Sequence, residues 1–324
     1  MVEDQLESAY TTAALQALES FSIEPSHIKL VAVSENVTFR VSVADDDTDL
    51  VVRLHRPGYN SIEELNSERL WTKALFEAGI AVQETLLTSE GQHFALVDVP
   101  GTGERCYAGM TTWLEGTPLS DHLELAENRK GRTHYFGKIG ELAATMHNLS
   151  TQWKAPPGFT RPRLDLDGLL GEAPRWGRFW EHESLTDVEA TTLLQAREDA
   201  RNALAAYGER PDNFSVTHAD LHPDNIVWNG IDLALIDFDD LAYGWHVYEL
   251  ASVLVEYRPA ADFEALGAAL LDGYQAYRPL TQRDITMLPA FVLIRGMVTM
   301  GWFQQRPEHA GSEYYKELKK WVLE

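Results

Sequence analysis

The order of apolar and polar residues predicts two kinds of structure in different parts of the chain. In the first third, short segments with alternating or continuous apolar residues indicate strands. These segments are residues 28–33, 36–44, 49–55, 83–87, 94–99 and 106–112. Apolar residues at helical spacing predict helices over residues 3–20 and 61–78. The second helix begins with a capping box, because Glu64 follows Ser61 at the required distance of three residues.

The rest of the chain reads mainly as helix. Helical patterns cover residues 133–149, 186–207, 244–256, 262–277, 281–303 and 312–322. Residues 156–174 are rich in Pro and Gly and predict a surface loop. We therefore expect an α+β fold with two lobes: a small antiparallel-sheet lobe of residues 1–112 and a larger, mainly helical lobe of residues 113–324.

One stretch, residues 216–240, concentrates the candidate chemistry; it reads VTHADLHPDNIVWNGIDLALIDFDD. Its Asn-Gly pair lies between two short apolar runs, which is the strongest short-range signal for a β-hairpin. Pairing of residues 226–228 with residues 233–236 would fold Asp237 back beside Asn225. Carboxylate and amide oxygens suit a hard cation such as Mg²⁺. Asp220, in the same loop, could accept a proton from a hydroxyl group.

This layout resembles the catalytic core of kinase-like phosphotransferases, in which H-R-D-x-x-x-x-N is followed by D-F-G. Residues 218–220 (HAD) take the place of the first triplet, Asn225 keeps the four-residue gap, and residues 237–239 (DFD) replace D-F-G. The form HADLHPDN…IDFDD is more similar to the aminoglycoside phosphotransferase and choline kinase family. Within it, the chain resembles the branch of the bacterial stress-response kinase and homoserine-kinase-like proteins. The resemblance implies a protein-kinase-like fold and ATP-dependent transfer of a phosphoryl group to a hydroxyl.

The resemblance also implies roles for single residues. Asp220 would orient the acceptor hydroxyl and take its proton, while Asn225 and Asp237 would hold Mg²⁺ against the phosphates of ATP. Arg53 stands in the strand where the family usually has a phosphate-binding Lys, and arginine can also bind phosphate. Glu68 falls on the apolar stripe of its helix, where a carboxylate needs a partner, so we expect it to pair with Arg53. Glu64, one turn earlier, is the alternative partner.

Further residues are expected to support the nucleotide and the loop. In the family, a Glu-Asn-x-x-Tyr/Phe pattern covers the nucleotide phosphates, and residues 35–39 (ENVTF) agree with it, which makes Asn36 and Thr38 candidates. The stretch lacks the glycines of a phosphate-cradling loop. The segment that contains Met110 and Trp113 matches the linker whose backbone binds the adenine edge.

Three more residues are assigned to supporting roles around the loop. His218 would brace the loop by hydrogen bonding. Asp239 would be an auxiliary metal or substrate contact, since it points with Asp237 on strand alternation. Glu249 stands where the family usually has an Asp that braces the loop, and it is one methylene longer.

Composition narrows the function classes. Asp and Glu number 50 against 27 Lys and Arg, a formal net charge of −23. A net negative charge disfavours nucleic-acid binding, because the phosphates of a nucleic acid are also negative. It is compatible with a small hydroxyl acceptor that carries a cationic amine, although solubility or adaptation to salt is the preferred explanation. The single cysteine, Cys106, excludes an internal disulfide and a cysteine-based zinc site. The start of the chain lacks a signal-peptide pattern, and the apolar stretch 285–303 is interrupted by Pro289 and Arg295, so we expect a cytoplasmic protein without a membrane span.

Alternatives of other classes stay open. A metallohydrolase is one, because residues 218, 220, 222 and 224 alternate as His, Asp, His and Asp and could face zinc from one strand. Pro223 interrupts such a strand, and Asn225 would have no purpose there. A catalytically silent nucleotide-binding regulator is another. The acceptor could be an amino alcohol, a homoserine-like amino acid, an aminosugar or a protein Ser/Thr, the last as in a stress-response-type protein kinase. The sequence does not decide between ATP and GTP, nor the oligomeric state.

Overall fold

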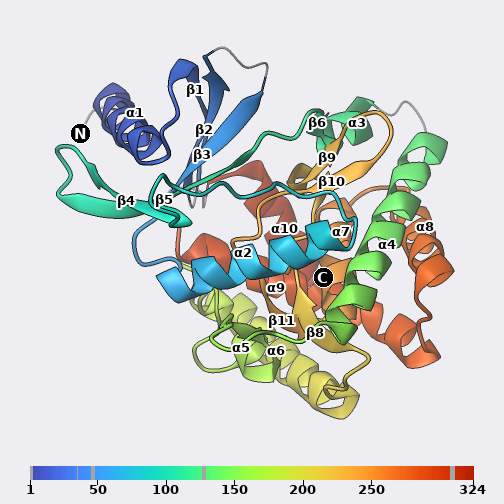
Figure 1. Ribbon diagram of the computed structural model, residues 1–324. Coiled ribbons are helices and arrows are strands. Elements are labelled where there is room, and N and C mark those ends of the chain that lie inside the picture. The colour runs from blue at the N-terminus through green and yellow to red at the C-terminus, as the bar shows by residue number, and fades with distance from the viewer. Residues whose placement is uncertain (1–2, 35, 45–47, 126–128, 307–310) are drawn as a thin grey trace. The chain divides into compact units, whose positions relative to one another are not determined.

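The computed structural model describes residues 3–34, 36–44, 48–125, 129–306 and 311–324 (Figure 1). The chain forms two compact units. Unit 1 comprises Met1–Gly116, Ala155–Thr160 and Ala234–Asp239, and unit 2 comprises Thr117–Lys154, Arg161–Leu233 and Asp240–Glu324. The chain therefore returns to unit 1 twice after Gly116, and its second return contains two of the residues assigned to the site, Asp237 and Asp239.

Unit 1 is built on an antiparallel sheet of five strands in the order β1-β2-β3-β5-β4. The strands are β1 (Pro25–Val33), β2 (Asn36–Val43), β3 (Asp49–His55), β4 (Phe94–Val99) and β5 (Glu104–Thr112). Helix α1 (Glu3–Ser20) packs against β3 and β4 (Figure 1). Leu18 of this helix and Phe39, Val52 and Met110 of the sheet are buried in one apolar core. The predicted antiparallel sheet and leading helix are confirmed.

The predicted strand over residues 83–87 is wrong, because the structure has only an isolated bridge there, between Thr85 and Thr111. The N–H of Leu86 donates to the carbonyl of Met110, and the N–H of Thr112 donates to that of Glu84, both at 2.9 Å. These bonds use the last residues of β5, beyond the part that pairs with β4. The segment therefore covers a short free edge and gains too few ladder bonds to continue as a strand.

Helix α2 (Ile62–Glu77) confirms the predicted capping box. The N–H of Glu64 donates to the Ser61 hydroxyl at 3.2 Å, and the N–H of Ser61 donates to the Glu64 carboxylate at 2.8 Å. Both orphan donors at the start of the helix are thereby satisfied. Leu65, Trp71 and Leu75 form its buried stripe. This fixes the helix face on which Glu68 lies.

Unit 2 is mainly helical, as predicted. Its helices are α3 (Leu119–Leu125), α4 (Arg129–Gln152), α5 (Leu166–Leu170), α6 (Asp187–Tyr207), α7 (His246–Leu254), α8 (Phe263–Tyr277), α9 (Gln282–Gln304) and α10 (Glu313–Leu323), with 3₁₀ turns η1 (Phe179–Glu181), η2 (Pro223–Asn225) and η3 (Val255–Tyr257). By length and composition α9 could cross a membrane, but half of its apolar window is buried in the protein. Its Phe291, Ile294 and Met297 are fully buried, as in the core helix that the sequence predicts.

Two small sheets accompany these helices. One has the order β10-β9-β6 and consists of β6 (Thr117–Pro118), β9 (Ile226–Trp228) and β10 (Leu233–Leu235). Strands β9 and β10 are the predicted hairpin, and Gly230 in its turn has φ +94°, a conformation that suits glycine. The other has the order β7-β11-β8 and consists of β7 (Arg163–Leu164), β8 (Phe214–Thr217) and β11 (Ala242–Trp245).

Two predictions in this unit need correction. The predicted loop over residues 156–174 contains β7 and α5, because Arg163 and Leu164 pair with β11 and Asp165 caps the short helix by accepting two backbone N–H groups. The helix expected from residue 244 begins at His246, because residues 242–245 pair with β8 as strand β11.

Candidate active site

The loop after β8 is held in an unusual backbone conformation. Ala219 has φ +69°, which costs a non-glycine residue about 1–3 kcal/mol and persists only where neighbours enforce it. Its N–H donates to Oε1 of Glu249 at 2.8 Å, and Glu249 on α7 is fully buried. Burial raises the pKa of Glu249 to about 7, against the opposing effects of His218 and the loop N–H groups. The predicted contact between Glu249 and the loop is present, and the side chain of His218 is fully buried beside it.

Asp220 presents a carboxylate with several polar neighbours, and a quarter of its side chain is exposed. Its Oδ1 is bonded to the guanidinium of Arg295. Its Oδ2 lies 3.2 Å from Nδ2 of Asn225 and 3.3 Å from Nε2 of His222. Burial alone would raise the pKa of Asp220, but the charges of His222 and Arg295 outweigh it and hold the pKa well below its usual value. The carboxylate is therefore ionised at neutral pH and can accept a hydrogen bond from a hydroxyl.

Arg295 of α9 is the functional candidate that sequence reasoning missed. Besides Asp220, its guanidinium lies 3.3 Å from the hydroxyl of Tyr248 and 3.4 Å from the carbonyl of Ala219. Its ring neighbours are Trp176 and Tyr248, at 5.8 and 5.9 Å from the ring centroids. A signal was present in the sequence, because Arg295 interrupts an apolar helix and a charge on a buried face needs a partner.

Residues 222–225 form a turn, as predicted, because η2 begins at Pro223. His222 lies between two acids, with Nδ1 at 3.4 Å from Oδ2 of Asp224. Burial would lower the pKa of His222, but Asp220 and Asp224 raise it well above its usual value. The turn at Pro223 contradicts the single strand of alternating His and Asp on which the zinc-hydrolase alternative depends.

The candidate phosphate and metal residues of unit 1 form a second cluster around Arg53 of β3. Its Nη1 lies 3.8 Å from Oε1 of Glu68, so the predicted pair is present. Its Nη2 contacts Oδ1 of Asp237 and lies 3.2 Å from Oδ2 of Asp239. Burial would lower the pKa of Arg53, but the three carboxylates raise it, so the guanidinium keeps its charge.

This cluster carries a surplus of negative charge that a divalent cation would balance. The net charge of the cluster is −2, because one guanidinium is opposed by the three carboxylates of Glu68, Asp237 and Asp239. The side chain of Asp237 is 41% exposed and open to an ion, whereas that of Asp239 is 8% exposed. Asp237, two residues after the end of β10, has φ +62°, a left-handed backbone conformation. Oxygen ligands with surplus negative charge are what Mg²⁺ prefers.

Asn36 and Thr38 of β2 lie next to this cluster. Asn36 is buried, its amide donates to Oδ2 of Asp239, and its side-chain oxygen accepts the N–H of Arg56 at 3.2 Å. Thr38 pairs with Arg53 in the sheet register. Glu35, the first residue of the predicted pattern, lies outside the described residues. Asn36 thus supports Asp239, a contact across 203 residues of sequence that the pattern did not indicate.

Met110 and Trp113 are tied into the sheet. Met110 is buried, and its carbonyl accepts the N–H of Leu86. The N–H of Trp113 donates to the carbonyl of Asp49 at 3.0 Å, and its ring carries the guanidinium of Arg40 at 4.3 Å. Their part in nucleotide binding stays a prediction.

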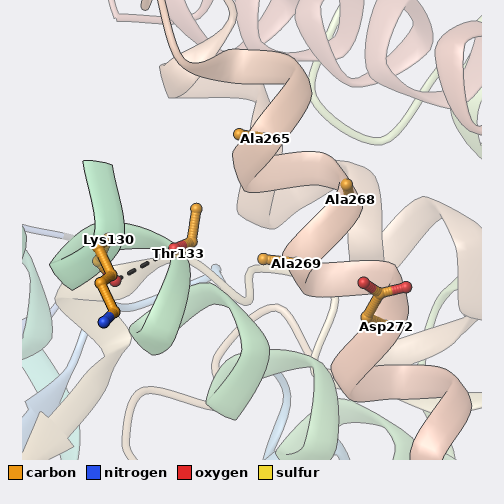
Figure 2. A pocket seen from close by; sticks show the side chains of 6 residues that line it. All are labelled: Lys130, Thr133, Ala265, Ala268, Ala269 and Asp272. Atoms are coloured by element: carbon orange, nitrogen blue, oxygen red, sulfur yellow. Dashed lines mark hydrogen bonds between the residues drawn. The ribbon is translucent and has the colours of Figure 1, made fainter.

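A recess also lies between α4 and α8 (Figure 2). Its lining residues are Lys130, Thr133, Ala265, Ala268, Ala269 and Asp272. The alanines supply only methyl groups, and none of the six lining residues belongs to the cluster around Asp220 or to the cluster around Arg53.

Comparisons with known proteins show which family the chain is similar to. A family model described as "Phosphotransferase enzyme family" matches residues 28–282. The structure of the microcompartment-associated aminopropanol kinase superposes with a TM-score of 0.81 at 26% identity, over 96% of this chain and 94% of that one. The structure of an amicoumacin kinase in complex with AMP-PNP, Ca²⁺ and Ami superposes with a TM-score of 0.78 at 17% identity, over 99% of this chain and 96% of that one.

A homoserine kinase of Chelativorans sp. (strain BNC1) is 34% identical over 207 residues, which are 62% of this chain and 61% of that protein. The family match spans the loop, the hairpin and the residues of both clusters except Arg295, which lies beyond residue 282. The α+β kinase-like fold that the sequence predicts is confirmed. The chain thus belongs to the phosphotransferase enzyme family and is a phosphotransferase, as the resemblance of its central motif indicates.

Proposed function

We propose that this phosphotransferase moves the γ-phosphoryl group of ATP to a hydroxyl of a small, amine-bearing acceptor. The observation that carries the proposal is the ionised carboxylate of Asp220, held in a braced loop beside Asn225. In this proposal residues 1–112 bind the nucleotide, and residues 113–324 provide the catalytic loop and the acceptor site. A cytoplasmic location, where ATP and Mg²⁺ are available, is part of it.

Four residues act on the reactants in the proposed reaction or hold Mg²⁺, and Glu68 anchors one of them. Asp220 orients the acceptor hydroxyl and takes its proton as the oxygen attacks. Arg53, anchored by Glu68, binds the phosphates of ATP. Asn225 and Asp237, at the two ends of the β9–β10 hairpin, would hold Mg²⁺. When bound, Mg²⁺ would neutralise part of the negative charge on the phosphates.

The remaining site residues support these groups. Asp239, with Asn36, fixes the position of Arg53, and Thr38 lies beside it in the sheet. The segment from Met110 to Trp113 would contact the adenine. His218 and Glu249 would hold the loop that contains Asp220.

The relatives support a small acceptor. Their names give aminopropanol and homoserine as acceptors, and both molecules combine an amine with a hydroxyl. The net charge of −23 favours the approach of a cationic molecule. The complex with AMP-PNP supports an adenine nucleotide as donor.

A screen of ATP consumption tests the proposal. Purified protein is supplied with ATP, Mg²⁺ and amino alcohols, hydroxy amino acids, aminosugars or generic protein acceptors. We expect ADP release above the acceptor-free rate with at least one amine-bearing small molecule. ADP release only with protein acceptors would favour the Ser/Thr kinase alternative. Release with none of them, together with tightly held stoichiometric zinc, would favour a metallohydrolase.

Arg295→Met is expected to lower kcat by about 10–100-fold, because it removes the cation that holds Oδ1 of Asp220. The KM for ATP should change by no more than about threefold, since Arg295 is not among the residues proposed to bind the nucleotide. Arg197→Met is the matched control: its side chain is 11% exposed, against 12% for Arg295, and it pairs with Glu172 far along the chain from the loop. Steady-state kinetics measure both variants. An Arg295→Met enzyme with wild-type kcat would remove Arg295 from the account.

A further inference from the structure

Helices α4 and α8 lie side by side and pack with their backbones almost in contact (Figure 1). Glycines make this possible. A Cβ atom added at Gly140 would lie 2.1 Å from the carbonyl oxygen of Leu270, and one added at Gly273 would lie 2.0 Å from that of Gly137. The close approach brings two polar side chains together inside unit 2: His147, two turns after Gly140, and Tyr274, the residue that follows Gly273.

These side chains begin a buried line of hydrogen bonds that ends at the catalytic loop. The hydroxyl of Tyr274 lies 2.8 Å from Nδ1 of His147. Nε2 of His147 lies 2.5 Å from Oε2 of Glu249. Oε1 of Glu249 accepts the N–H of Ala219 at 2.8 Å. The side chains of Tyr274, His147 and Glu249 are all fully buried.

The protonation states of this line are consistent with one another. Burial lowers the pKa of His147 well below its usual value, so the imidazole is neutral, with one donor and one acceptor nitrogen. Burial raises the pKa of Tyr274, so its hydroxyl keeps its proton and can donate to Nδ1. Nε2–H then donates to Oε2 of Glu249. Tyr274 thereby selects the tautomer of His147 that holds Glu249.

We propose that His147, with its tautomer set by Tyr274, is a positioning residue for phosphoryl transfer. It fixes the carboxylate of Glu249, which holds the left-handed backbone of Ala219 and so aims the side chain of Asp220. Without the bond from Nε2, the carboxylate of Glu249 can turn and release the N–H of Ala219. A displacement of about 1 Å at a reacting group can lower a rate 10²-fold. The inference rests on the proposed role of Asp220.

The chain offers a matched control beside His147. His246 stacks on it with ring centroids 4.2 Å apart and is also buried, at 2% exposure. Its Nε2 bonds to the hydroxyl of Ser215 at 2.7 Å instead of to Glu249. Substitution of either histidine disturbs the same core, but of the two it is His147 whose Nε2 bonds to Glu249.

The experiment compares three variants. In His147→Gln the side-chain amide can reach the position of Nε2 and donate to Glu249, whereas in His147→Asn the shorter side chain cannot. His246→Asn is the control. We expect His147→Asn to lower kcat by about 10–100-fold with the KM for ATP unchanged. We expect His147→Gln and His246→Asn to stay within about threefold of the wild type. Thermal denaturation checks that all three fold.

Hydrogen–deuterium exchange of residues 216–222 gives a readout that does not need activity. Exchange of the loop should quicken in His147→Asn and remain slow in the other two variants. Equal kcat and equal exchange in His147→Asn and the wild type would overturn the proposal, as would equal losses in His147→Asn and His246→Asn. A wild-type enzyme without turnover in the acceptor screen would refute the proposed function, and with it the positioning role, while loop exchange would still report whether His147 holds the loop.

Discussion

Replacing Asp220 with alanine is expected to lower kcat by about 10³-fold or more while the affinity for ATP stays within about threefold. The reason is that Asp220 is the ionised carboxylate assigned to the acceptor hydroxyl, and general-base catalysis contributes about 10²–10⁴-fold. Loss of hydroxyl orientation adds to this. ADP release under saturating ATP measures kcat, and calorimetric titration measures nucleotide affinity.

Asp220→Asn is the control for structural damage. It keeps the size of the side chain, and its amide oxygen can still accept from Arg295, but it cannot take a proton. We expect it to lose as much kcat as the alanine variant with less loss of thermal stability, since alanine leaves the Arg295 charge without its partner. Turnover within a few-fold of the wild type in either variant would remove Asp220 from the role of base.

Asp237→Ala is expected to weaken the binding of Mg²⁺–ATP by about 10–100-fold. The carboxylate of Asp237 belongs to the cluster around Arg53. Its removal changes the net charge of that cluster from −2 to −1. Affinity for ATP measured without Mg²⁺ should not fall, because removal of a carboxylate reduces repulsion of the phosphates. Titration of the nucleotide with and without Mg²⁺ distinguishes these effects.

Asp232→Ala is the matched control, since Asp232 is an exposed acid in the turn of the same hairpin. It should bind Mg²⁺–ATP like the wild type. An equal loss of affinity with and without Mg²⁺ in Asp237→Ala would mean that Asp237 acts on the nucleotide directly or through the fold, and would contradict its assignment as a metal ligand.

Local patterns predicted the local structure well. The capping box of α2 is present because Ser61 and Glu64 satisfy each other within one turn. The β9–β10 hairpin is present because Asn229 and Gly230 suit a tight turn, in which the Asn229 side chain accepts two backbone N–H groups. The strand predicted over residues 83–87 was wrong. The apolar pattern of this segment could not show that only the last residues of β5 were free to pair with it.

Contacts between distant residues were harder to predict. The Arg53–Glu68 pair could be inferred, because a carboxylate on a buried stripe needs a cation and the kinase-like arrangement supplies one. The bond from Asn36 to Asp239 could not, because no local pattern links residues in separate segments. In the sequence, Arg295 is only an interruption of an apolar helix. The structure places α9 beside the loop in unit 2 and shows that the partner of Arg295 is Asp220.

The central claim is that Asp220 serves an ATP-dependent transfer to a hydroxyl. Phosphorus NMR of a reaction with ATP, Mg²⁺ and the preferred acceptor tests it most directly. The account predicts a phosphomonoester signal that grows in step with ADP in the wild type and is absent in Asp220→Asn. Inorganic phosphate as the only new product, formed equally by both enzymes, would contradict it.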